Sequence, residues 1–467
     1  MTETAPGKAP WSELFSPGLV AKLGIVLLGV WINAADTLVT TTIMPSVAAD
    51  IGGYEAFSWA VAGFLMGSVI ASASAGRLAE IFGLGRASTV AGIVFALGCV
   101  GSALALDMNL FLAGRLVQGI GSGWFSGFAM VAIAQLFPRR QLARVFAIVS
   151  GVWGIATLLG PLLGGLLAES GQWRVVFWAF AVQAVLFAIL APRAFGNAEG
   201  KALSGRVPLV QLVLIALGIG VIGMADRLAQ PAMQLAAIAG GMTLLGMTLW
   251  VDRHAPVPLL PRQASNPFSV IGAGYLAVFA LTAASSPFSI YVPPILQQLR
   301  DLSPLEAGYV VGAMALAWTC AAFVVSNVRD GRERVPLVAG AALVCTGVSL
   351  QLWLVPQLHI AAIVGAGVVM GLGFGLCSAL INRRAIIHLT TDEEAIGSAA
   401  LMTVRQVGGA VGAALAGVAA NVAGFGDGLS DASALATAQT VFIAGLPLAL
   451  LGLLAALQMT RSPRFQN

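Results

Sequence analysis

Long uncharged apolar runs constrain the fold of this chain more than any other feature. Runs of about 20 residues recur from Lys22 to Thr460, and an α-helix needs about 20 apolar residues to cross about 30 Å of hydrocarbon. In lipid only helices and closed barrels satisfy every backbone hydrogen bond, and these runs lack the two-residue alternation of barrel strands. Hydrophobic residues make up 58% of the chain and charged residues 9%, far from the roughly 25% charged residues of a soluble protein. The sequence therefore predicts an all-α polytopic membrane protein.

The positions of the positive charges predict the orientation of the chain. If the chain starts in the cytoplasm, nineteen of its 24 Lys and Arg residues fall on the cytoplasmic side, and Arg174, Arg227 and Arg300 fall on the other side. By the positive-inside rule, we expect both termini to be cytoplasmic. The net charge of +4 thus reflects membrane topology, and we expect no nucleic-acid partner.

The order of the runs predicts fourteen membrane-spanning helices. Residues 207–225 and 232–251 carry no charge and are each about a membrane thickness long, so we interpret them as an inserted hairpin. A twelve-helix count would leave the charge pattern unchanged, but it would make the connection between the halves unusually apolar. The expected organisation is a cytoplasmic segment 1–21, a six-helix bundle 22–191, a linker with the hairpin 192–267, a second six-helix bundle 268–459 and a cytoplasmic tail 460–467.

Asp36, Arg115 and Arg405 are the charged residues that lie deep inside apolar runs. An ion in hydrocarbon costs several kcal/mol, so such residues usually mark ion or substrate pathways. Asp36 lies about 21 Å from the inner edge and Arg115 about 9 Å from the outer edge of a core of about 30 Å, so their depths coincide. We hypothesise that Asp36 is the proton-coupling carboxylate and that Arg115 tunes it. A static ion pair between two helices is the alternative.

Other polar and aromatic residues are candidates for a substrate cavity. Gln118 lies one helical turn beyond Arg115 and shares its face, whereas Arg405 has no evident acidic partner, so substrate contact and a structural role both stay open. Aromatic rings attract cations, although aromatic residues in membrane helices often only pack. The remaining cavity candidates are Trp31, Asn33 and Trp124.

The sequence contains no pattern that indicates enzymatic chemistry. Neither HExxH nor GxSxG occurs, and His254, His359 and His388 fall at loops or at the ends of spans. The four cysteines lie far apart inside apolar runs, without the spacing of a metal site. We therefore expect no enzyme, no metal and no phosphate-binding loop for ATP.

Three motifs resemble a known family. The stretch GRLAEIFGLGRAS (76–88) resembles the cytoplasmic loop signature of the major facilitator superfamily, LAGRLVQGIGSG (112–123) its fourth-helix signature, and LLGPLLGG (158–165) the fifth-helix signature of its drug and proton antiporters. Together with the inserted hairpin they resemble the fourteen-helix drug:proton antiporter branch of multidrug efflux type. Glu80 stands where the loop signature usually has Asp.

The resemblance implies two six-helix bundles plus the hairpin, and proton-coupled export of small amphiphilic or drug-like compounds by alternating access. The implied partners are a small-molecule substrate, protons and membrane lipid, with the proton gradient as energy source and no cofactor. It further implies a monomer in the inner membrane of a bacterial-type cell. A symporter or importer, or an exporter of one metabolite or lipid, is the alternative.

The resemblance also assigns two groups of residues. The cytoplasmic gate loop comprises Gly76, Glu80, Gly83 and Arg86, and a plain loop that only sets topology is the alternative. The antiporter helix contains Gly160, Pro161, Gly164 and Gly165, which we expect to form a close-packed helix where the halves meet.

Overall fold

The described part of the chain folds into fourteen α-helices. The computed structural model describes residues 11–52, 57–196, 207–225, 228, 230–328, 332–424 and 431–461, and within these ranges it contains α-helices and short 3-10 helices but no strand. The helices are α1 (Pro17–Ile51), α2 (Phe57–Phe82), α3 (Leu84–Ala103), α4 (Met108–Leu136), α5 (Leu142–Glu169), α6 (Trp173–Phe195), α7 (Leu209–Gly223), α8 (Pro231–His254), α9 (Val270–Arg300), α10 (Pro304–Val325), α11 (Arg334–Leu354), α12 (Ile360–Ile387), α13 (Glu394–Val422) and α14 (Asp431–Arg461).

Polar residues between the apolar runs set the helix ends. The Asp107 carboxylate accepts a hydrogen bond from the backbone of Leu110 at 2.9 Å and begins α4. Ser303 and Glu306 form a capping box at the start of α10. Such caps satisfy backbone N–H groups that have no partner inside the helix. Each long apolar segment therefore becomes a separate helix with a defined start.

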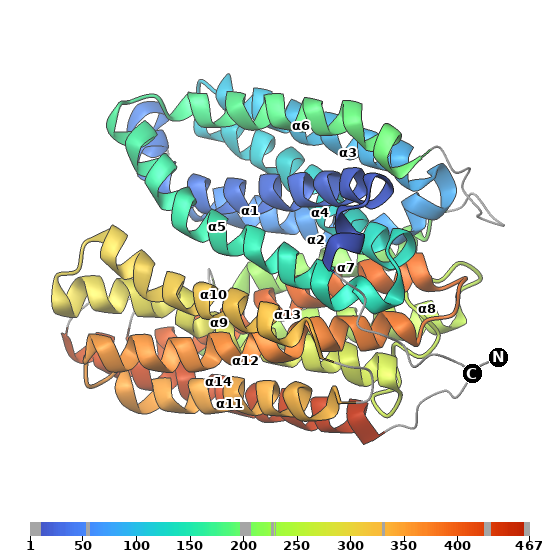
Figure 1. Cartoon of the computed structure of the whole chain (residues 1–467). Helices are drawn as coiled ribbons and strands as arrows, with labels where there is room; N and C mark the ends of the chain where they lie inside the picture. The colour runs from blue at the N-terminus through green and yellow to red at the C-terminus, as the bar shows by residue number, and fades with distance from the viewer. Residues whose placement is uncertain are drawn as a thin grey trace.

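The helices form two bundles, one of α1–α6 and one of α9–α14 (Figure 1). Glycines at spacing four bring the helices close together in both bundles. A Cβ on Gly119 or Gly123 of α4 would overlap backbone carbonyls of α2, and one on Gly371 or Gly375 of α12 would overlap those of α10. Small residues allow such close contact where lipid supplies no hydrophobic driving force. The spacing of four therefore places these glycines on the faces where neighbouring helices touch.

The inserted segment between the bundles forms the helix pair α7 and α8. The two helices cross at Gly218 and Gly241, and α7 packs against Val69 and Ala73 of α2 as well as Val407 of α13. The hairpin therefore contacts one helix from each bundle.

The structure contains fewer candidate membrane spans than the fourteen that the sequence predicts. Twelve helices of the described part are long and apolar enough to cross a membrane, and α2 and α7 are not among them. The α7 helix has 15 residues, or about 22 Å, which is short of a core of about 30 Å. The chain is a multi-pass membrane protein, and the count of fourteen spans stays a prediction.

Hydrogen bonds join the two bundles near one end of the molecule, where α1 begins and α14 ends. Ser72 of α2 lies 3.2 Å from Thr403 of α13 and donates to Gln406 at 2.8 Å. Between α5 and α10, Arg144 donates to Asn327 at 3.2 Å. These residues lie between that end and the middle of their helices, so the structure is closed there. If both termini are cytoplasmic, as predicted, this closed end is the cytoplasmic one.

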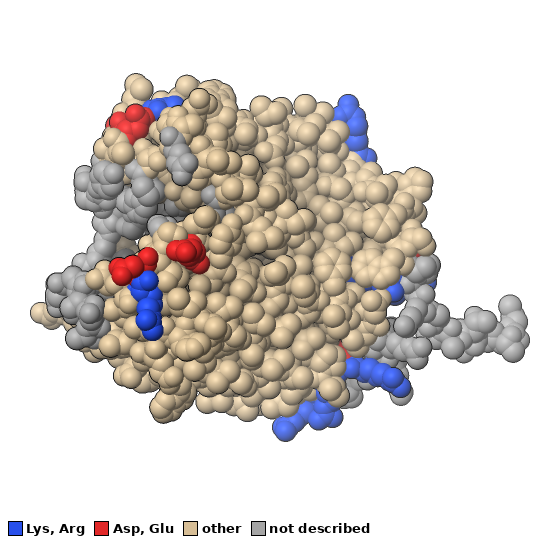
Figure 2. All heavy atoms as spheres, turned by 60° about the vertical axis from the view of Figure 1, so that its left-hand side comes forward, with Lys and Arg blue, Asp and Glu red and all other residues tan. Residues whose placement is uncertain are grey.

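The surface is that of a protein in lipid. Large apolar side chains such as Leu97 and Val182 are 62% and 69% exposed, which is uncommon for water-facing leucine and valine in such numbers. Figure 2 shows charged side chains near the margins of one view and a broad uncharged band between them.

Candidate functional site

The position of α4 creates a buried polar site in the first bundle. Gly119 and Gly123 press α4 against α2, while Gly114 and Gly121 press it against α3, where a Cβ would meet Ser102 and Phe95. With neighbours this close on two sides, the polar side chains in the middle of α4 are kept from water. Arg115 is 2% exposed and Gln118 is 0% exposed.

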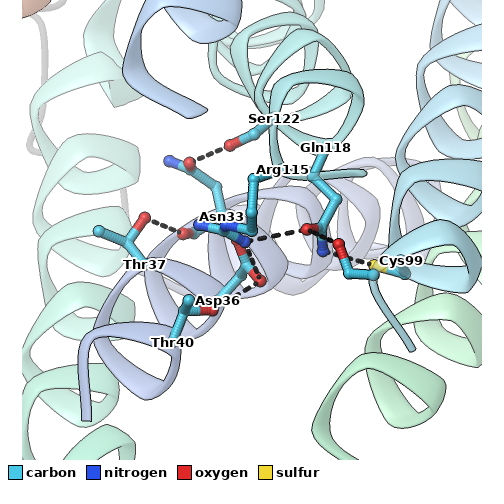
Figure 3. Close-up of polar contacts among 9 residues, drawn as sticks. Asn33, Asp36, Thr37, Thr40, Cys99, Arg115, Gln118 and Ser122 are labelled. Carbon is cyan, nitrogen blue, oxygen red and sulfur yellow. Dashed lines mark hydrogen bonds and ion pairs between the residues drawn. The ribbon is translucent and has the colours of Figure 1, made fainter. Parts of the chain in front are cut away.

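An ion pair between Asp36 of α1 and Arg115 of α4 forms the centre of this site (Figure 3). The Nη1 atom of Arg115 donates to Oδ2 of Asp36 at 2.9 Å and to Oδ1 at 3.1 Å. Asp36 is 0% exposed, and Thr40 donates to its Oδ1 at 3.3 Å. The two residues whose depths coincide in the sequence are thus brought into direct contact.

Gln118 connects the ion pair to α3. Its Oε1 accepts from Arg115 at 3.0 Å and from the Ser102 hydroxyl at 3.1 Å, and its Nε2 donates to Cys99 Sγ at 3.0 Å. The guanidinium also lies over the Phe64 ring, 4.4 Å from its centroid. Gln118 therefore accepts from the same nitrogen of Arg115 as Asp36 does, and it links the ion pair to α3.

Asn33 extends the polar site along α1, one turn before Asp36. Its Oδ1 accepts a hydrogen bond from Ser122 of α4 (Figure 3), and its backbone carbonyl accepts from Thr37 at 2.8 Å. Because Asn33 and Ser122 are bonded to each other, these two side chains are engaged within the protein.

The two tryptophan candidates lie away from the ion pair. Trp31 donates to Gln183 of α6 at 2.9 Å, and Trp124 donates to Ser74 of α2 at 2.9 Å. Both indole groups therefore join helices within the first bundle. Their assignment to a substrate cavity stays a prediction.

Arg405 of α13 lies in the second bundle, beside a small cavity. The cavity is lined by residues of α9, α12 and α13, and the guanidinium lies 5.6 Å from the centroid of the Trp318 ring of α10. Its side chain is partly exposed, and its Nε is buried without a hydrogen-bond partner in the described part of the chain.

The gate-loop residues lie at the end of the molecule where the bundles touch. A Cβ on Gly76 would overlap the backbone of Ala395 and Ile396 in α13, so this glycine permits the closest contact between α2 and α13. Gly83 has a φ of 79° and makes the turn into α3. Glu80 accepts from Arg77 at 2.7 Å, and Arg86 is exposed.

The glycines of the antiporter helix contact the first bundle. A Cβ on Gly160 would meet Leu38 of α1 at 2.7 Å, and one on Gly164 would meet Thr42 at 2.9 Å. Gly165 has open space around it, and the side chain of Pro161 lies outside the described residues. The α5 contacts with α10 come earlier in the helix, where Thr319 donates to the carbonyl of Ser150 at 2.9 Å. The nearest neighbours of Gly160 and Gly164 are therefore on α1, and the expected meeting of this part of α5 with the other half stays a prediction.

Several residues of the polar site could not be identified from the sequence. Cys99 and Ser102 of α3, Ser122 of α4 and Thr40 of α1 are uncharged, and their residue types are common in apolar helices. Only the spacing of Asn33, Asp36 and Thr40, at one helical turn each, could have indicated that a face of α1 is polar.

The arrangement places a carboxyl group in direct contact with a cation inside the bundle. A buried carboxylate favours its protonated form, whereas a nearby guanidinium favours the ionised form. A change in the separation of Asp36 and Arg115 would therefore change the proton affinity of the site. As for metals, no group of three His, Cys, Asp or Glu residues lies together in the ranges that the structure describes.

Comparisons with known proteins agree with the helical architecture. The sequence model of the Major Facilitator Superfamily matches residues 26–413. A probable multidrug-efflux transporter of Mycobacterium tuberculosis is 33% identical over 99% of both chains. The multidrug transporter protein MdtP of Bacillus subtilis is 23% identical over 85% of this chain and 74% of its own length.

Solved structures with little sequence similarity share the fold. The proton:xylose symporter XylE aligns with a TM-score of 0.66 at 16% identity, over 95% of each chain. The human organic anion transporter MFSD10 aligns with a TM-score of 0.62 at 16% identity, over 94% of this chain and 100% of its own.

Proposed function

The chain belongs to the major facilitator superfamily, and we propose that it exports small amphiphilic compounds in exchange for protons. Its family and fold are those of membrane transporters and not of enzymes. The multidrug-efflux relative at 33% identity supports export of drug-like compounds. Proton coupling, a monomeric state and a place in the inner membrane of a bacterial cell are parts of the proposal.

The observation that carries the proposal is the buried Asp36–Arg115 ion pair. A buried carboxylate and guanidinium in contact form a site with two states. In one state both groups are ionised and paired, and in the other they are separated and the carboxyl group is protonated. Because the pair joins α1 to α4, protonation of Asp36 releases α1 from α4. Rocking of the bundles then exposes the loaded carboxyl to the other side.

The test is transport into proteoliposomes under a lumen-acid pH gradient. Three fluorescent dyes serve as model substrates: cationic ethidium, neutral dansylglycinamide and anionic dansylglycine. We expect at least one of them to accumulate in the lumen while protons leave, and we expect an ionophore that collapses the gradient to abolish accumulation. Accumulation of dye only under the reversed, lumen-alkaline gradient, with protons entering, would indicate symport, and flux insensitive to either gradient would indicate a channel. Either result would overturn the proposal.

The variant Asp36→Asn tests the proton site itself. We expect it to lose gradient-driven accumulation while it still exchanges dye for dye across the membrane, because only the proton step is removed. Transport at the wild-type rate would show that Asp36 carries no coupling proton.

A stability control is needed, since Asp36→Asn leaves the Arg115 charge unpaired, and breaking a buried pair in this way costs about 3–5 kcal/mol. The double variant Asp36→Asn/Arg115→Gln removes both charges. We expect it to fold, to exchange dye and to be uncoupled as well.

A further inference from the structure

Arg405 differs from the other arginines inside the described helix bundles because it has no polar partner. Arg115 is paired with Asp36, Arg383 with Glu333 at 2.6 Å, and Arg144 with Asn327. Within the described residues, Arg405 forms neither an ion pair nor a hydrogen bond, although a guanidinium carries five N–H donors. Ions kept inside a membrane protein are almost always paired or face a pathway.

Two hydroxyl groups beside Arg405 are also without side-chain hydrogen bonds in the part of the chain that the structure describes. Thr282 of α9 and Ser378 of α12 line the same cavity as Arg405. Hydroxyls in apolar helices usually donate to a carbonyl of the preceding turn, as Ser286 does to Thr282 at 3.1 Å and Ser349 to Cys345 at 2.9 Å. Thr282 and Ser378 do not, so three polar groups from three helices share one cavity with their donors free.

An aromatic platform borders this cluster. The rings of Trp318 and Phe374 stack with centroids 4.9 Å apart and planes at 16°, and Arg405 lies over the Trp318 ring. Phe374 also lines the cavity. A flat apolar surface therefore adjoins a cation and two hydroxyls, which is the arrangement that a compound with an aromatic body and an anionic group would fill.

We propose that Arg405, Thr282 and Ser378 form an anion subsite for transported compounds that carry a carboxylate, sulfonate or phosphate group next to an aromatic ring. The guanidinium pairs with the anionic group, the two hydroxyls donate to its oxygens, and the Trp318–Phe374 stack holds the ring. The cavity is small, so it takes the anionic group while the body of the compound lies between the bundles. This inference rests on the proposed export function, because it assigns the subsite to the exported compound.

The test compares two dyes that differ in one group. Dansylglycine carries a carboxylate where dansylglycinamide carries a carboxamide, and binding to the purified full-length protein in lipid nanodiscs is followed by energy transfer from tryptophan to the dansyl group. A desolvated charge-assisted hydrogen bond changes affinity by about tenfold or more. We expect the wild type to bind dansylglycine at least about tenfold more tightly than the amide.

Variants of Arg405 locate this preference. We expect Arg405→Gln to lose the preference for dansylglycine, because only dansylglycine binding is weakened. We expect Arg405→Lys to retain part of this preference. The exposed Arg461 at the end of α14 supplies the matched control, because Arg461→Gln removes the same charge far from the cavity. Equal preference in wild type and Arg405→Gln, or no preference in wild type, would overturn the subsite.

A second pair of variants keeps the inference testable if Arg405→Gln does not fold. Ser378→Asp places a carboxylate in the cavity as an internal partner for Arg405, whereas Ser378→Asn has nearly the same shape without the charge. We expect Ser378→Asp to exclude dansylglycine and Ser378→Asn to bind it. Identical binding by both would contradict the inference, and so would full displacement of dansylglycine by equimolar inorganic sulfate, which would indicate a site for simple ions.

These measurements need no pH gradient, so they are independent of proton coupling. If the anion preference depends on Arg405 but no dye is driven by protons, the proposed function fails and the subsite stands. If transport is proton-driven and Asp36 is required, but the two dyes bind alike, only the subsite fails.

Discussion

Arg115 and Arg405 are both cations inside apolar helices, but their surroundings differ. Arg115 is held between Asp36 and Gln118, so its charge is compensated within the protein. Arg405 has an aromatic ring and a small cavity beside it. The surroundings of Arg115 suit the proposed proton site, because such a site needs a carboxylate that can exchange its cationic partner for a proton. Those of Arg405 suit a site that takes its counter-ion from a ligand.

Gln118 should tune the proton site through Arg115. In Gln118→Glu, a second carboxylate competes with Asp36 for the guanidinium, so the proton affinity of Asp36 should rise. We expect the pH dependence of dye transport to move upward by about one unit, in the range typical of nearby charges. Gln118→Leu should lower the rate with a smaller shift, because it only removes one of the acceptors of Arg115 Nη1, which still donates to Asp36.

The control for this prediction is Gln183→Glu, because Gln183 bonds Trp31 and not the ion pair. If both glutamate variants move the pH profile equally, Gln118 has no specific effect on Asp36.

At the scale of helices, the fold depends on glycines where backbones touch. Gly123→Ala would place a methyl group against the carbonyl of Ser68, and overpacking of this kind costs about 1–3 kcal/mol. Gly165→Ala adds the same methyl group to a position with open space. We expect the midpoint of thermal unfolding in detergent to fall for Gly123→Ala and to be unchanged or slightly higher for Gly165→Ala, because alanine favours helix. Equal midpoints would contradict the packing role.

Asp252 at the end of α8 connects the α7–α8 hairpin to the segment that follows it through hydrogen bonds. This buried carboxylate accepts from the backbone of Leu259 at 2.6 Å and Leu260 at 3.0 Å, and from Gln211 of α7 at 3.3 Å. Asp252→Asn replaces one acceptor oxygen with a donor, so at least one of these bonds is lost. We expect amide hydrogen exchange at Leu259 and Leu260 to accelerate by about tenfold or more, because a bond to a charged acceptor contributes about 1.5–3 kcal/mol.

Asp107→Asn is the matched control for the hairpin variant. Asp107 caps α4, and asparagine caps a helix about as well as aspartate, so exchange at the start of α4 should stay unchanged. Unchanged exchange at Leu259 and Leu260 in Asp252→Asn would show that this carboxylate does not hold the segment.

At the scale of the whole molecule, the bundles must separate at their closed end during transport. Ser72 and Thr403 face each other across this contact, with hydroxyl oxygens 3.2 Å apart. In a variant free of the four native cysteines, Ser72→Cys/Thr403→Cys should form a disulfide on mild oxidation. We expect this cross-link to stop dye transport and a reductant to restore it.

Each single cysteine variant with the same oxidant serves as the control, and it should transport normally. Undiminished transport by the cross-linked protein would mean that α2 and α13 do not separate at this point.

The sequence by itself determined the helices and the depth of the buried charges. Apolar length decides whether a segment crosses a membrane, and the fixed rise per residue converts sequence position into depth. For that reason the sequence showed that Asp36 and Arg115 lie at the same depth, which allows the two residues to meet if their helices are neighbours.

The tertiary structure decided what each helix face contacts. Depth carries no information on rotation about the helix axis or on which helices are neighbours, so the contact of Gln118 with Ser102 and Cys99 could not be derived. The same reason explains why Trp31 and Trp124 lie away from the ion pair, and why the antiporter-helix glycines pack on α1. The packing of α9, α12 and α13 brings Thr282, Ser378 and Arg405 to one cavity. The sequence could not show this, because the first and last of these residues are more than a hundred positions apart and the three share no sequence pattern.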